Sequence, residues 1–72
     1  MNEAIQQSPP STILRLGHVK LRTGLSRSTI YERIKAGEFP AQVSLGPRAV
    51  GWLESDIEAW IASRVERSRT GR

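Results

Sequence analysis

The chain has 72 residues, the size of one small domain, and contains no cysteine and a single histidine, His18. Disulfide bonds and thiolate metal sites are therefore excluded, and no zinc site is expected. Its 11 lysines and arginines outnumber 7 acidic residues, which gives a net charge of +4. Most of these cations are arginines, which suit bidentate contacts with phosphate and guanine. The charge favours a polyanionic partner, although basic residues also keep a small protein soluble.

The two ends of the chain differ from its middle. Residues 1–11 are polar and rich in Gln, Ser and Pro, so we expect a flexible leader there. Residues 68–72 are polar and basic and are expected to form a flexible tail. Residues 12–67 would then form the domain. No apolar run reaches membrane-spanning length, and the N-terminus lacks the pattern of a secretory signal.

The domain opens with two short predicted elements. Residues 13–16 alternate weakly between apolar and polar, which predicts a short strand. Residues 18–23 are expected to form a brief helix. That helix would bury Val19 together with Leu21 or the aliphatic stem of Arg22.

A turn and a capped helix follow. Gly24 supplies the turn, and Ser26 is a good N-cap because its hydroxyl can accept a hydrogen bond from the backbone N–H of Thr29. The helix is expected over residues 27–36, and Gly37 ends it. A short helix held against another helix by a tight turn is typical of the recognition helix in a helix-turn-helix.

The next segment, residues 39–53, reads as a β-hairpin. Two alternating runs surround a Gly-Pro loop at Gly46 and Pro47, and this pattern predicts paired antiparallel strands. A hairpin that directly follows a recognition helix is a wing. The sequence therefore predicts a small α+β fold, mainly helical: a winged helix-turn-helix with a short N-terminal strand and a C-terminal helix.

The C-terminal helix is expected to begin at Ser55, which forms a capping box with Glu58. Arg64 and Arg67 lie near its end, where the helix dipole favours cations, so we assign them no function. One core is expected to gather apolar residues from all elements: Leu14, Leu16, Val19, Leu25, Ile30, Ile34, Phe39, Val43, Leu45, Val50, Trp52, Ile57, Trp60 and Ile61.

One face of the 27–36 helix has no structural role in this scheme. With Ile30 and Ile34 toward the core, the 100° step per residue predicts which polar side chains point outward: Ser28, Tyr31, Glu32 and Lys35. Thr29 is expected at one margin, and Arg27 and Arg33 on opposite sides of the buried stripe. Such a face suits reading base edges and phosphates, although it could be ordinary solvated surface. Arg27 lies in the first turn, where a cation opposes the helix dipole, and Arg48 lies at the tip of the hairpin. The candidate DNA-binding residues are Ser26, Arg27, Ser28, Thr29, Tyr31, Arg33, Lys35 and Arg48.

No catalytic arrangement is evident in the sequence. It has no cysteine nucleophile, no serine paired with a plausible histidine and aspartate, and no glycine-rich phosphate loop. We therefore expect neither an enzyme nor a bound metal or cofactor.

The motifs in this order resemble the AlpA family of small prophage-associated transcriptional regulators, which are related to excisionases and to MerR-type winged helices. The resemblance covers about residues 13–65 and rests on Ile13-Leu-Arg-Leu16, Thr23-Gly-Leu-Ser-Arg-Ser-Thr-Ile-Tyr31, Gly37-Glu-Phe-Pro40, Val43-Ser-Leu-Gly46 and Val50-Gly-Trp-Leu-Glu-Ser-Asp-Ile-Glu-Ala-Trp-Ile61. It implies a bacterial or phage protein that controls prophage genes such as integrase or excision functions. The implied DNA contacts are Ser26, Arg27, Ser28, Thr29, Tyr31, Arg33 and Arg48.

The leading hypothesis is a sequence-specific regulator of duplex DNA, with its recognition helix in the major groove and its wing on the adjacent backbone or minor groove. The alternatives are an excisionase-like factor that bends DNA and a protein-binding inhibitor module. We expect double-stranded DNA as the partner, with no membrane and no small-molecule ligand. The chain would be a monomer in solution, able to assemble cooperatively on tandem sites, in the bacterial cytoplasm and associated with the nucleoid.

Overall fold

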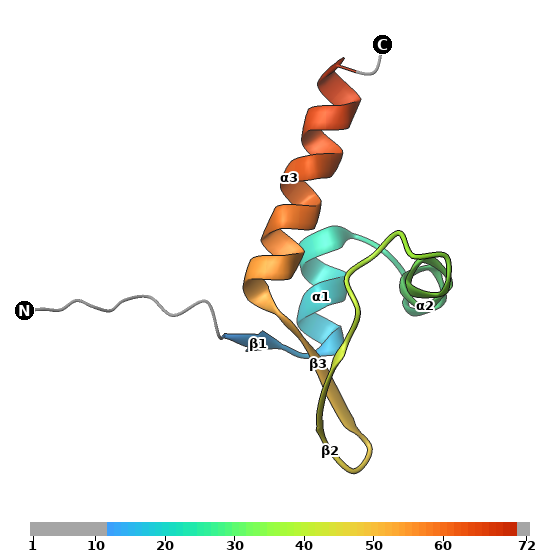
Figure 1. The fold of residues 1–72 in the computed structure, drawn as a ribbon, viewed down its shortest axis with the longest axis vertical. Coiled ribbons are helices and arrows are strands. Elements are labelled where there is room, and N and C mark those ends of the chain that lie inside the picture. The colour runs from blue at the N-terminus through green and yellow to red at the C-terminus, as the bar shows by residue number, and fades with distance from the viewer. Residues whose placement is uncertain (1–11, 71–72) are drawn as a thin grey trace, which may run out of the picture.

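The computed structural model describes residues 12–70 and has the predicted winged helix-turn-helix architecture (Figure 1). In chain order its elements are β1 (Ile13–Leu14), α1 (Leu16–Thr23), α2 (Arg27–Lys35), β2 (Val43–Gly46), β3 (Ala49–Leu53) and α3 (Glu54–Thr70). This confirms the predicted fold class. The predicted leader, residues 1–11, lies outside the described residues. Residues 68–70, expected in a flexible tail, continue α3 as helix.

The three strands form an antiparallel sheet with β3 in its centre. On one side of β3, Leu14 lies opposite Trp52, and on the other side Val43 lies opposite Gly51. The β2–β3 register shifts between Ser44 and Gly46. This irregularity removes Leu45 from the simple alternation, and its side chain is 43% exposed, so its predicted place in the core is wrong.

The core takes one buried side chain from each helix, from β1 and from β3, together with Phe39 from the segment between α2 and β2. Trp52 is fully buried, and its indole N–H donates to the carbonyl oxygen of Pro40 at 3.1 Å, so the polar atom of the ring is satisfied. The buried residues are Leu14, Val19, Ile30, Phe39, Trp52 and Ile57. Partly buried side chains packed against them are Leu16, Leu25, Tyr31, Ile34, Trp60 and Ile61.

Helix α1 begins at Leu16, two residues before the predicted start, because the strand ends at Leu14. Val19 is fully buried as expected, but Leu21 is 83% exposed and does not join the core. The guanidinium of Arg22 instead reaches across to the first turns of α3.

The contact between α1 and α3 is a double ion pair. One terminal nitrogen of Arg22 donates to the carboxylate of Glu54, and the other donates to that of Glu58. Glu58, predicted to form a capping box with Ser55, joins two helices through its pair with Arg22. Helix α3 begins at Glu54, one residue before the predicted N-cap Ser55, and the Glu54 backbone N–H donates to the carbonyl of Thr12 at 2.8 Å.

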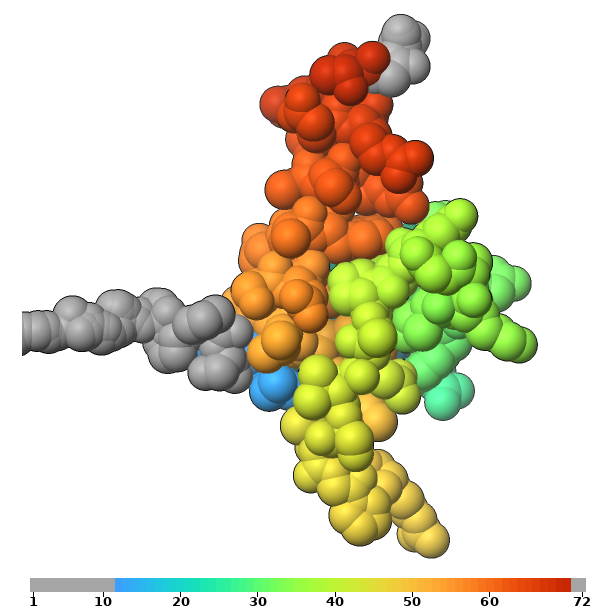
Figure 2. Space-filling model, in the orientation of Figure 1, coloured from blue at the N-terminus to red at the C-terminus, as the bar shows by residue number. Residues whose placement is uncertain are grey.

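The wing and the C-terminal half of α3 extend in opposite directions from the core, and α2 lies on one side of it (Figure 1). The space-filling view shows the same arrangement, with the hairpin below the body and the end of α3 above it (Figure 2). Helix α2 is thus flanked by the hairpin on one side and by α3 on the other.

Candidate nucleic-acid interface

Both ends of α2 are closed by hydrogen bonds from within the chain. Ser26 has an extended backbone, and its hydroxyl oxygen accepts from the Thr29 backbone N–H at 3.2 Å, as predicted. At the other end Gly37 has φ +75°, and its N–H donates to the Ile34 carbonyl at 3.0 Å. The N–H of Glu38 donates to the carbonyl of Arg33 at 2.8 Å, which completes a Schellman motif. The helix is therefore fixed in length without a ligand.

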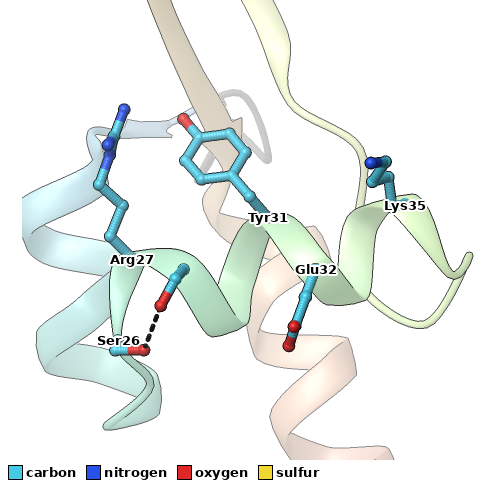
Figure 3. A pocket seen from close by; sticks show the side chains of 6 residues that line it. Ser26, Arg27, Tyr31, Glu32 and Lys35 are labelled. Atoms are coloured by element: carbon cyan, nitrogen blue, oxygen red, sulfur yellow. Dashed lines mark hydrogen bonds between the residues drawn. The ribbon is translucent and has the colours of Figure 1, made fainter.

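The outer face of α2 is uncovered and lines an open hollow of about 680 Å³. Ser26, Arg27, Ser28, Glu32 and Lys35 are all exposed. Figure 3 shows Arg27, Tyr31 and Lys35 rising from the helix in one direction, whereas Glu32 points the other way. The structure thus brings together five of the predicted site residues: Ser26, Arg27, Ser28, Tyr31 and Lys35.

Tyr31 is half-buried, which corrects its predicted position on the fully exposed face. Its ring packs edge-on against Trp52, with the ring centroids 6.4 Å apart. The guanidinium carbon of Arg27 lies 5.3 Å from the centre of the same ring. The aromatic ring therefore belongs to the edge of the core and orients Arg27, while the hydroxyl end points away from the helix (Figure 3).

Thr29 and Arg33 lie on the other flank of α2, away from the hollow. The hydroxyl of Thr29 accepts from Ser26 at 3.0 Å and supports the cap. Arg33 lines two hollows with Glu38, one of which extends to α3. The eight predicted site residues therefore do not form one patch.

Arg48 is separate from the α2 hollow, in the two-residue loop between β2 and β3. Its φ is +60°, in the left-handed region, and among residues 12–70 it is the one non-glycine residue with a positive φ. An L residue in this region costs about 1–2 kcal/mol. Positive φ is common in tight hairpin loops, so the two-residue turn imposes this conformation on Arg48.

Two arginines near the end of α3, where the helix dipole favours cations, also line a groove. Arg64 and Arg67 lie one turn apart on α3 and share this groove with Arg33. Their spacing of three residues places them on one helix face. That spacing was visible in the sequence, but the packing of α3 beside α2 was not.

Other kinds of site are not evident in the described part of the chain. Within residues 12–70 no three His, Asp or Glu side chains gather in a way that could hold a metal ion. In the same range no helix is both long and apolar enough to cross a membrane.

Comparisons with known proteins point to one family. Residues 12–65 match the model of the family described as prophage CP4-57 regulatory protein (AlpA). The chain is 53% identical over 58 residues to the uncharacterized protein ORF88 of Enterobacteria phage P4, a match that covers 81% of this chain. It is 38% identical over 60 residues to the DNA-binding transcriptional activator AlpA of Escherichia coli K12, covering 75% of this chain. The matches span 66% of the phage protein, just under two thirds, and 86% of the E. coli protein.

Proposed function

The chain belongs to the AlpA family of prophage regulatory proteins, and on this premise we propose that it binds a specific site on duplex DNA and regulates transcription of prophage genes. The predicted family is confirmed, and because the family consists of DNA-binding regulators, the prediction that the chain is not an enzyme is confirmed too. The observation that carries the proposal is the uncovered polar face of α2. An α-helix with side chains, about 10–12 Å across, fits the major groove, which is about 12 Å wide.

Each side chain on this face has a chemical role in the proposal. The hydroxyls of Ser28 and Tyr31 contact base edges, and Arg27 and Lys35 contact phosphates on the flank of α2 that faces the sheet. Glu32 can accept a hydrogen bond from the amino group of cytosine. The wing places Arg48 against the neighbouring backbone or in the minor groove.

The strain at Arg48 allows a test that separates stability from binding. Arg48→Gly relieves the left-handed backbone and removes the cation, whereas Arg48→Ala removes the cation and keeps the strain. Both variants should bind every duplex more weakly, with a salt dependence lower by about one phosphate contact. The glycine variant should also unfold at the same or a higher temperature than the alanine variant.

The DNA site itself can be found by selecting bound duplexes from a random library with the wild-type chain. We expect a recurring sequence, and a footprint over a single site near a promoter. No enrichment, and no affinity for any duplex at 50 mM salt, would contradict the proposal and favour a protein-binding module. A footprint over an array of repeats within an attachment site would instead indicate a recombination factor. A cytoplasmic, nucleoid-associated location follows from the proposal.

A further inference from the structure

A basic groove lies on the flank of α2 that faces away from the wing. Arg33 of α2 and Arg64 and Arg67 of α3 line it, and Trp60 forms part of its wall. The hollow measures about 490 Å³. In Figure 2 the C-terminal half of α3 rises beside the green surface of α2 and the turn that follows it.

The cations of this groove are only partly neutralised within the described structure. Three guanidinium groups face one carboxylate, that of Glu38, whose oxygen lies 4.0 Å from a terminal nitrogen of Arg33. The Nε of Arg33 is buried and has no hydrogen-bond partner among residues 12–70. Arg22, in contrast, has a carboxylate on each terminal nitrogen. The groove therefore has a net positive charge that an external anion can neutralise.

The wall of the groove is held in place by the core. The indole N–H of Trp60 donates to the Glu38 carbonyl at 2.9 Å, and its ring centroid lies 4.9 Å from that of Phe39. The guanidinium carbon of Arg64 lies 5.2 Å from the centre of the Trp60 ring. These contacts join α3 to the end of α2, so the groove arginines keep a fixed position relative to the proposed recognition helix.

We infer that this groove binds the phosphate backbone of the DNA strand on the far side of the major groove from the wing. The inference rests on the proposed function. A helix that fills the major groove has one sugar-phosphate backbone on each flank. Tyr31 packs on Trp52 of β3, so its flank faces the sheet and the wing, while Arg33 faces α3. Arginine suits phosphate through its planar fork of donors. The wing and the groove would then hold the two backbones.

The test removes one or both of the α3 charges of the groove and measures DNA affinity as a function of salt concentration. The probe is the duplex selected by the wild-type chain. Arg67→Gln changes an exposed residue, and the double variant Arg64→Gln/Arg67→Gln removes both α3 cations. The matched control is Arg69→Gln, on the same helix with the same charge loss but outside the groove lining. Circular dichroism and the thermal midpoint verify that each variant keeps the fold, since Arg64 also packs over Trp60.

Each lost phosphate contact should lower the slope of log K against log salt by about 0.9. At 0.15 M salt this corresponds to about fivefold weaker binding for Arg67→Gln and about 30-fold for the double variant. Arg69→Gln should weaken binding by less than about twofold, because solvent and salt screen it. Phosphate ethylation should interfere on both strands with the wild type, and its effect at one phosphate of the far strand should weaken with Arg67→Gln.

Equal slopes and affinities for the double variant and the Arg69→Gln control would overturn the inference while leaving the proposed function intact. Normal DNA binding combined with lost transcriptional activation would also overturn it, and would assign the groove to an acidic protein surface. If the wild-type chain selects no duplex, the proposed function fails, and this inference fails with it.

Discussion

Replacing Gly51 by alanine should destabilise the domain, because the added methyl group has no room. A Cβ at this position would lie 2.9 Å from the carbonyl oxygen of Leu14, 2.5 Å from Cγ2 of Ile13 and 3.3 Å from Cδ1 of Leu45. The two side-chain atoms can move aside. The carbonyl cannot, because it belongs to the backbone of β1, which pairs with β3 through Leu14 and Trp52.

The expected cost is that of an overpacked core, about 1–3 kcal/mol. Gly17→Ala is the matched control, since a Cβ there meets nothing within 4 Å and the residue lies in α1. Alanine in place of glycine favours a helix by up to about 1 kcal/mol. The same chemical change should therefore destabilise the protein at Gly51 and leave it as stable or more stable at Gly17.

Thermal unfolding followed by tryptophan fluorescence measures both effects. For a domain of this size each kcal/mol shifts Tm by about 4–8 °C. Gly51→Ala should lower Tm by about 4–24 °C, and Gly17→Ala should raise it by at most about 8 °C. A Gly51→Ala variant that unfolds at or above the wild-type temperature would refute the packing of β1 against β3.

Four further substitutions probe the recognition helix and its support. Ser26→Ala should lower the free energy of unfolding by about 1 kcal/mol through loss of the cap, seen as a lower urea midpoint. Ser28→Ala should change it by less than about 0.5 kcal/mol, and equal effects of the two would argue against the cap. Arg22→Gln should lower the free energy of unfolding by about 1 kcal/mol, because the ion pairs of Arg22 are partly exposed. If this destabilisation is the same in 1 M salt, its cause is not ionic. Tyr31→Phe should keep the ring contact with Trp52 and the wild-type urea midpoint, yet reduce discrimination between selected and scrambled duplexes. Unchanged discrimination would show that the Tyr31 hydroxyl does not contact base edges.

The parts of the fold that were predicted correctly depend on local chemistry. The cap at Ser26, the left-handed Gly24 and Gly37 and the Gly-Pro loop of the hairpin are each specified by a few neighbouring residues. Such signals act over one turn and do not depend on the rest of the structure. The position of Ile30 in the core followed from the same local periodicity.

The parts that were missed depend on contacts between distant segments. Arg22 contacts Glu54 and Glu58 across more than 30 positions, and nothing near Arg22 in the sequence indicates which partner it takes. Tyr31 lies at the margin of the helix face, where only the position of Trp52 decides whether the ring is buried. Leu45 was predicted in the core but is exposed, because the strand register shifts beside it. The order and approximate bounds of the helices and strands could therefore be predicted, whereas the burial and contacts of residues at the margins of these elements could not.

The proposed function requires the outer face of α2 to contact duplex DNA. The most direct measurement is an NMR titration of the ¹⁵N-labelled chain with the duplex that it selects. We expect the backbone amides of residues 26–35 and those of Gly46, Arg48 and Ala49 in the hairpin loop to shift most, while those of α1 stay nearly unchanged. Large shifts confined to α1, with α2 and the loop unaffected, would contradict it.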